Sequence, residues 1–249
     1  MRSAADAAPS FLYVPDLATQ LGEFTLAGDE ARYLTRVVRV REGECVTGSD
    51  GAGLLASLRC VHTRPKLVLR VEARRLEPAP ARARLLCGAP EGERGDWLVE
   101  KLAELGVTEL VPVQTQRVRW DKAARRERWQ RLTVAALRQS RSAWQMRVLE
   151  PVELAAAVVE TGGGARWLAD PAGGSSAGLA LPPDEPVTGV VGPSAGFSDD
   201  ERKLLGSQGF VSVRLAMLRL RTETAAVSLA ALWAAARARD PDPPAASAP

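Results

Sequence analysis

The sequence predicts an α/β protein of two domains: a small β-barrel followed by a domain built on a parallel sheet. Between residues 11 and 72, short β-type segments are separated by turns, which is typical of a small barrel. From residue 84 onward, short apolar segments alternate with amphipathic helical segments, the pattern of a parallel sheet covered on both faces. The proline-bearing stretch 76–83 is typical of a linker. We therefore expect domains over residues 10–74 and 82–240.

Composition excludes several classes of protein. The 249 residues carry a net charge of +3, a mild balance that permits an RNA partner without requiring one. The sequence contains no run of eighteen apolar residues, so it predicts no membrane span. The first residues lack the apolar region of a secretory signal. Cys45, Cys60 and Cys87 have no metal-ligand spacing, so we expect free thiols in the cytoplasm and no metal. With His62 as the single histidine, a catalytic triad is improbable.

In the first domain, the segment 24–26 predicts a strand and 30–37 a short helix. Residues 44–47, 54–61 and 66–72 predict further strands, with a turn at 49–53. The arginines at 36, 39 and 41 stand close together between the helix and the next strand. Such a run is a solvated charged face or a contact surface for phosphates.

In the second domain, buried strands are expected at residues 84–89, 109–112, 166–169, 187–191 and 211–215. Helices are expected at 95–105, closed by Gly106, and at 127–141 and 154–159. Loops are expected at residues 170–171 and 173–176, the latter because its composition is limited to glycine and serine.

The C-terminal stretch 188–236 is the one around which the second domain is organised. After the strand at 187–191, the glycine-rich segment 192–196 must turn. Ser198 is a typical N-cap with Glu201 as its capping-box partner, and Thr222 is the expected N-cap of the last helix. Two glycine-bearing loops at strand ends form either a small-ligand site or ordinary turns, and their spacing does not decide between the two.

Polar residues gather between the last strand and the last helix. Backbone N–H groups at such a helix start can hold polar ligand atoms. Arg221 and Glu223 either form an internal ion pair or face a substrate. The sequence has no phosphate-binding loop, no dinucleotide fingerprint and no carboxylate cluster for Mg²⁺.

Four motifs carry a resemblance that extends from about residue 11 to residue 236. The segment 191–198 resembles the Gly-Pro-Glu-Gly-Gly-Phe-Ser loop of the bacterial 16S rRNA uracil-N3 methyltransferases, the RsmE family. Residues 220–225 match that family's Leu-Arg-Thr-Glu-Thr-Ala ending. Residues 101–107 resemble its Lys-Ala-Thr-Glu-Leu-Gly helix end, and 37–43 resemble its N-terminal Val-Leu-Arg-x-x-x-Gly. Each motif alone is weak, but their order in one chain is specific.

The resemblance implies a PUA-like N-terminal β-barrel that binds RNA and a C-terminal SPOUT domain with a deep trefoil knot. It implies a homodimer that binds S-adenosylmethionine and methylates N3 of a uridine in 16S rRNA of the 30S subunit. Arg221 is then the cation that stabilises the uracil anion, and Glu223 handles the proton or orients the base. By motif position, the cofactor residues are Ala169, Pro171, Gly192, Pro193, Gly196, Leu215, Leu220, Thr222 and Ala225. The arginines that would contact RNA are Arg32, Arg36, Arg39 and Arg41.

The sequence departs from the family at several positions. Ser194 and Ala195 stand where the family has Glu-Gly, Ala216 replaces a glycine and Leu218 replaces an arginine. These departures keep open a degenerate relative that binds RNA or cofactor without methyl transfer. A third interpretation is an unrelated α/β enzyme with a β-barrel accessory domain.

Overall fold

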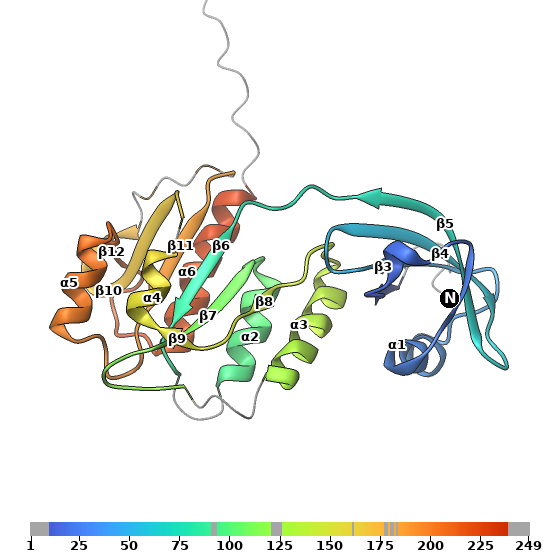
Figure 1. Cartoon of the computed structure of the whole chain (residues 1–249), viewed down its shortest axis with the longest axis horizontal. Coiled ribbons are helices and arrows are strands. Elements are labelled where there is room, and N and C mark those ends of the chain that lie inside the picture. Colours follow the sequence, from blue (N-terminus) through green and yellow to red (C-terminus); the bar gives the residue numbers. More distant parts are fainter. Residues whose placement is uncertain are drawn as a thin grey trace, which may run out of the picture. The chain divides into compact units, whose positions relative to one another are not determined.

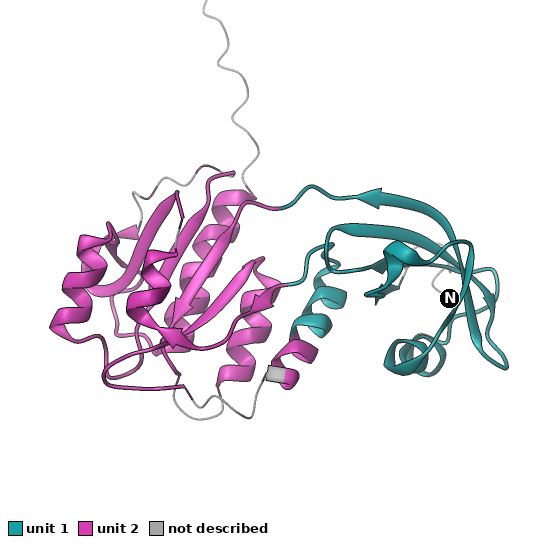
Figure 2. Ribbon diagram, viewed as in Figure 1, with its two compact units in different colours: residues 1–79, 133–145 teal, residues 80–132, 146–249 magenta. Residues whose placement is uncertain are grey.

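The structure is a computed structural model that describes residues 10–90, 94–120, 126–160, 162–176, 179, 182 and 184–238. The chain forms two compact units (Figure 2), one made of residues 1–79 and 133–145 and the other of residues 80–132 and 146–249. We call them unit 1 and unit 2. Helix α3 (Arg126–Ser140) contributes residues to both.

Unit 1 contains a five-stranded sheet in the order β1-β3-β4-β5-β2. Its strands β1 and β3 are parallel and the other neighbours are antiparallel. Alternating side chains of these strands fill one apolar core, in which Leu12, Leu58 and Leu69 are fully buried. The strands are β1 (Phe11–Tyr13), β2 (Glu23–Leu26), β3 (Cys45–Ser49), β4 (Leu54–His62) and β5 (Leu67–Leu76).

The helix expected at residues 30–37 has a different form. A short 3-10 helix (Leu17–Thr19) precedes β2, and α1 (Gly28–Arg32) continues directly into a π-helix over Tyr33–Val38. The helix ends at Arg39, which adopts the left-handed conformation with φ 58°. A single non-glycine residue in that conformation ends a helix without a glycine, so composition gave no signal for this boundary.

The segment 133–145 contacts the rest of unit 1 through the helical segment 28–38 and through strand β3. Arg138 Nη1 donates to Glu30 Oε1 at 2.8 Å, and the same guanidinium lies over the Tyr33 ring. Burial raises the pKa of Glu30, and the charge of Arg138 opposes that rise. Ser49 Oγ donates to the carbonyl of Ala143 at 3.3 Å. A helix that the sequence pattern placed in the second domain thus ends in unit 1.

Unit 2 is built on a parallel sheet in the order β12-β10-β11-β6-β7-β8, with β9 paired to β7 (Figure 1). The sequence prediction of an α/β fold with a mostly parallel sheet is therefore confirmed. The strands are β6 (Ala83–Cys87), β7 (Glu109–Gln114), β8 (Arg147–Val148), β9 (Val152–Glu153), β10 (Ala165–Ser175), β11 (Val187–Val191) and β12 (Val211–Arg214).

Helices cover this sheet on both faces because its strands are apolar on both sides. Leu85 and Cys87 of β6 belong to a core with α2 (Gly95–Glu104) and α6 (Thr222–Arg237), whereas Leu86 belongs to a second core with α4 (Leu154–Val159) and α5 (Asp199–Ser207). Trp233 of α6 is the largest fully buried side chain of the first core. The alternation along β6 thus divides the helices between the two faces.

Strand β10 is longer than expected. The predicted loops at 170–171 and 173–176 are wrong in large part, because β10 continues to Ser175 and pairs again with β12 after a register shift between Ala169 and Gly174. A Cβ on Gly173 would lie 2.5 Å from the carbonyl carbon of Ser212. Glycine therefore permits the close approach of two backbones here, rather than a flexible loop.

The two helices that follow the glycine-bearing loops begin differently. Ser198 caps α5 as predicted: its hydroxyl accepts from Glu201 N at 3.2 Å, and Glu201 Oε2 accepts from Ser198 N at 2.7 Å. The prediction for α6 was wrong. Its N-cap is Arg221, and Thr222 is the first helical residue, with its side chain bonded elsewhere.

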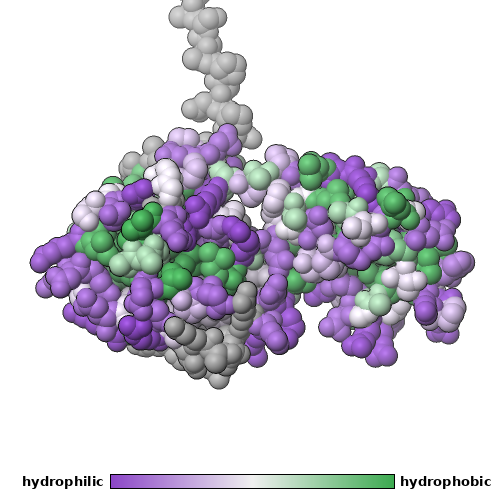
Figure 3. All heavy atoms as spheres, viewed as in Figure 1, coloured by the Kyte–Doolittle hydropathy of each residue, from purple (hydrophilic) through white to green (hydrophobic). Residues whose placement is uncertain are grey.

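In Figure 3, hydrophilic side chains cover most of the visible face of each unit, and hydrophobic residues are scattered between them. The large apolar side chains that are exposed include Met217 and Leu218, in the segment between β12 and α6, with exposed fractions of 87% and 82%. Within the described residues, no helix combines the length and the apolar character needed to span a membrane.

Candidate active site

Unit 2 has a cavity of about 420 Å³ beyond the carboxyl ends of β11 and β12, beside the second half of β10. This is the edge at which parallel sheets hold ligands. Most of its walls come from three segments: residues 169–172 of β10, the end of β11 with the turn that follows it, and residues 215–225, which lead from β12 into α6. Arg202 of α5 adds to the lining. The nine residues assigned to the cofactor by motif position all lie on its lining: Ala169, Pro171, Gly192, Pro193, Gly196, Leu215, Leu220, Thr222 and Ala225.

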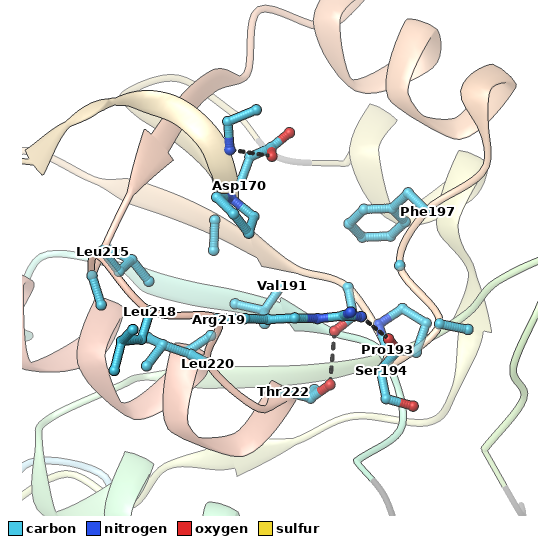
Figure 4. Close-up of a pocket in the computed structure, with 18 of the residues that line it drawn as sticks. Asp170, Val191, Pro193, Ser194, Phe197, Leu215, Leu218, Arg219, Leu220 and Thr222 are labelled. Carbon is cyan, nitrogen blue, oxygen red and sulfur yellow. Dashed lines mark hydrogen bonds between the residues drawn. The ribbon is translucent and has the colours of Figure 1, made fainter.

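One partly buried hydrogen bond joins two of these walls. The Thr222 hydroxyl donates to the carbonyl of Gly192 at 3.0 Å (Figure 4), across 30 positions of sequence. Thr222 is 5% exposed, whereas Gly192 is half-buried. The bond therefore holds the start of α6 against the end of β11.

The turn that follows Gly192 is closed by its own backbone and by two arginines. Gly196 N donates to Pro193 O at 2.8 Å, and Gly196 has φ 69°, which glycine adopts without strain. Arg219 Nη2 donates to the carbonyl of Ser194 at 2.9 Å, and Arg117 Nη1 donates to that of Ala195 at 2.7 Å. The family motif has Glu-Gly at positions 194 and 195. In this chain, the main-chain carbonyls at these two positions accept hydrogen bonds from arginine side chains.

A smaller cavity of about 290 Å³ adjoins the first. Its lining includes Ser194, Arg219, Leu220 and Thr222, which also line the larger cavity. It adds the two residues that were expected to be catalytic, Arg221 and Glu223. The structure thus brings the expected catalytic residues beside the expected cofactor residues.

Arg221 and Glu223 do not pair with each other, so the interpretation of these two residues as an internal ion pair is wrong. Glu223 is 5% exposed, and its Oε1 accepts from Arg94 Nη1 at 2.7 Å. Arg94 lies 129 positions earlier, directly before α2. The Arg221 side chain is exposed, and within the described part of the chain it makes no ion pair or hydrogen bond. Its guanidinium is therefore available to a ligand of the smaller cavity.

Beneath the site lies Cys87, at the carboxyl end of β6. Burial, and next the negative charge of Glu223, raise the pKa of the Cys87 thiol to about 12. A thiol is nucleophilic only as thiolate, so Cys87 is an inert part of the core. No group of three or more His, Cys, Asp or Glu residues that could hold a metal ion occurs within the described residues.

The four arginines expected to contact RNA lie in unit 1, and all four are exposed: Arg32, Arg36, Arg39 and Arg41. Arg32 is neutralised by Asp29 at 2.9 Å. The other three have no carboxylate partner within the described residues. These three guanidinium groups are therefore open to a negatively charged partner.

Sequence reasoning gave no role to three charged residues of the site. Arg94 is brought to Glu223 only by the fold, and no spacing signals a pair so far apart. Asp170 lines the larger cavity and pairs with Arg202 at 2.6 Å; it was placed in the expected loop at 170–171. Arg219 is one of the polar residues expected between the last strand and the last helix, but the family motif gave it no function.

Comparison with known proteins shows that the chain is similar to members of one family. Residues 77–234 match the family model described as RNA methyltransferase domain. A protein named ribosomal RNA small subunit methyltransferase E from Mycobacterium tuberculosis is 33% identical over 240 residues, which cover 86% of this chain and 87% of the relative. The protein of the same name from Aquifex aeolicus is 33% identical over 153 residues, 55% of this chain and 61% of the relative.

Two solved structures resemble the whole fold. A ribosomal RNA small subunit methyltransferase E from Neisseria gonorrhoeae, bound to S-adenosyl methionine, is 25% identical with a TM-score of 0.80, over 90% of this chain and 96% of that one. A putative methyltransferase from Legionella pneumophila in complex with SAM is also 25% identical, with a TM-score of 0.80, over 92% and 98% of the two chains.

The burial of Cys87 gives a prediction about thiol reactivity. Iodoacetamide at about pH 8 should modify exposed Cys45 in the folded protein and leave Cys60 and Cys87 intact, because burial raises the pKa of both. Peptide mass spectrometry measures the modified positions. Denatured protein should be modified at all three, and folded Cys45→Ser at none. Modification of Cys87 in the folded protein would contradict the described packing.

Proposed function

The chain belongs to the family of ribosomal RNA small subunit methyltransferase E proteins, and we propose that it transfers a methyl group from S-adenosylmethionine to N3 of a uridine in 16S rRNA. One observation carries the proposal. The nine residues that match the family's cofactor motifs come from three separate segments, and they line a single cavity of about 420 Å³. The two residues expected at the reacting base line the cavity beside it.

The larger cavity has the chemistry that S-adenosylmethionine requires. Val191, Leu215 and Leu220 supply an apolar wall for an adenine ring. Backbone groups of the turn after β11 and of the segment before α6 line the same cavity. Their N–H groups can donate to the ring nitrogens of adenine, and their C=O groups can accept from its exocyclic amino group. The Asp170 carboxylate, held by Arg202, is an acceptor for hydroxyl groups.

When bound, S-adenosylmethionine supplies a methyl group that its positively charged sulfur has already activated. Little covalent help is then needed from the protein, and alignment supplies much of the rate. The acceptor needs more help, because uracil N3 carries a proton. Forming the new carbon–nitrogen bond requires that proton to leave and the carbon–sulfur bond to break, with its electron pair remaining on sulfur as a thioether.

We assign Arg221 to the charge that develops on the uracil ring. Its free guanidinium lines the smaller cavity, and a fixed cation next to a uracil stabilises the form that has lost the N3 proton. Glu223, held by Arg94, is assigned to orient the N3–H by accepting its hydrogen bond. Both side chains start from a helix end that is fixed by Thr222, so neither needs a large rearrangement.

The finer features of the fold are part of the same proposal. We propose that unit 2 is threaded as a trefoil knot of the SPOUT type, that unit 1 is a PUA-like RNA-binding module, and that the protein is a homodimer acting on the 30S subunit in the cytoplasm. The family membership supports the knot and the PUA-like module, and the small residues of α6, which allow a second helix to approach closely, support the homodimer. A crystal structure would test the threading, and light scattering that gives monomer mass at micromolar concentration would exclude the dimer.

The arginines of unit 1 give a test of RNA binding by that unit. Arg36→Ala should reduce the slope of log affinity against log salt by about one unit, if the side chain neutralises one phosphate. Filter binding to small-subunit RNA at several salt concentrations measures the slope. Arg70→Ala is the matched control, because Arg70 is already paired with Glu23. Equal slopes for wild type and Arg36→Ala would remove Arg36 from the interface.

The role of Arg221 gives a kinetic prediction. Arg221→Ala should lower the single-turnover rate of methyl transfer about a hundredfold or more, the usual effect of losing one electrostatic group of a transition state. Affinity for S-adenosylmethionine, measured by calorimetry, should change little, because Arg221 lines the smaller cavity and not the larger.

Arg214→Ala is the matched control for that experiment. Arg214 is an exposed arginine of β12 that lines neither cavity, so its loss should leave the rate unchanged. If Arg221→Ala transfers methyl groups at the wild-type rate, Arg221 does not stabilise the charge on the uracil ring. A wild-type protein that binds S-adenosylmethionine and transfers nothing would favour the degenerate relative instead.

A further inference from the structure

Arg219 is the charged residue at the border of the two cavities to which neither the motifs nor the proposed chemistry assigns a role. It lines both cavities, together with Ser194, Leu220 and Thr222. Figure 4 shows its side chain extended from the segment that holds Leu218 and Leu220 toward the turn at Pro193 and Ser194. The long side chain therefore crosses the space between two of the walls.

Two side-chain hydrogen bonds join the turn after β11 to the segment that leads into α6. The inner one, from Thr222 to Gly192, is partly buried. The outer one, from Arg219 Nη2 to the carbonyl of Ser194, is made by an exposed side chain. An exposed bond contributes little to global stability, because water competes for both partners. Its place is local: it joins the two walls at the solvent side.

The position of Arg219 also bears on alignment. Methyl transfer needs the donor carbon in one cavity and the acceptor nitrogen in the other to approach along one line, and a displacement of about 1 Å can cost a hundredfold in rate. The residues shared by the two cavities form the border that both ligands touch. Two of them, Thr222 and Arg219, are bonded to the opposite wall, and of these two Arg219 carries the charge and the longer side chain.

Arg117 provides an internal comparison. It donates to the carbonyl of Ala195, the residue next to Ser194, at 2.7 Å, so it clamps the same turn with the same kind of bond. Arg117 lines neither cavity. The two arginines thus make the same contact type on adjacent carbonyls, and only one of them spans the border.

We propose that Arg219 is a positioning residue of methyl transfer: its bond to the Ser194 carbonyl sets the separation of the two walls and so aligns the donor cavity with the acceptor cavity. The proposal rests on the proposed function, since it needs a donor in the larger cavity and an acceptor in the smaller. Because Leu218 occupies the position of the family's arginine, the role belongs to this sequence and not to the motif.

The test compares Arg219→Ala, Arg219→Lys and Arg117→Ala. Each variant is titrated with S-adenosylmethionine by calorimetry, melted, and assayed for single-turnover transfer of tritiated methyl groups to small-subunit particles with the donor saturating. Arg219→Ala should lose about tenfold to a hundredfold in rate, with a melting temperature close to that of the wild type. Arg219→Lys should recover part of the rate, because its ammonium group can reach the same carbonyl as a single donor. Arg117→Ala should match the wild type.

Three results would overturn the inference. Arg219→Ala at the wild-type rate would show that the bond aligns nothing. Equal losses for Arg219→Ala and Arg117→Ala would show that only the rigidity of the turn matters. A weaker affinity for S-adenosylmethionine in calorimetry, together with a wild-type rate at saturating donor, would make Arg219 a donor-binding residue. Failure of the proposed function is distinguishable, because in that case the wild-type protein itself transfers no methyl group.

Discussion

The hydrogen bond from the Thr222 hydroxyl to the Gly192 carbonyl is the interaction on which the site depends. It is partly buried, it joins the end of β11 to the start of α6, and both residues line the larger cavity. With that bond in place, Arg221 and Glu223 project from a fixed helix start beside a fixed turn. Without it, the two walls of the cavity would lose their inner connection.

Charge around the site follows from the same arrangement. Arg117 and Arg219 donate hydrogen bonds to main-chain carbonyls, and Arg94 pairs with the carboxylate of the buried Glu223. Arg219 and Arg221 both line the smaller cavity, and neither pairs with a carboxylate among the described residues of unit 2, so the charge at this cavity is positive. An RNA base with developing negative charge matches such a cavity, and a positively charged ligand would not.

Much of the fold could be predicted from the sequence, because local signals agreed with it. The buried strand at 187–191 and the capping box at Ser198 are local, and both are confirmed. Contacts between distant residues could not be predicted: Arg94 reaches Glu223 only in the folded chain. The length of β10 was also missed, since glycines at 173 and 174 indicate a loop unless the neighbouring backbone of Ser212 is known. The motifs correctly predicted nine residues that line one cavity. They could not predict the contact of Arg219, because Arg219 belongs to none of them.

Nucleoside mass spectrometry of 16S rRNA tests the central claim most directly. Small-subunit particles that lack methylation at uracil N3 would be incubated with the protein and with S-adenosylmethionine that carries a deuterated methyl group. The account predicts deuterated 3-methyluridine in 16S rRNA, and none when the protein is omitted. No labelled nucleoside, or a label on a different nucleoside, would contradict it.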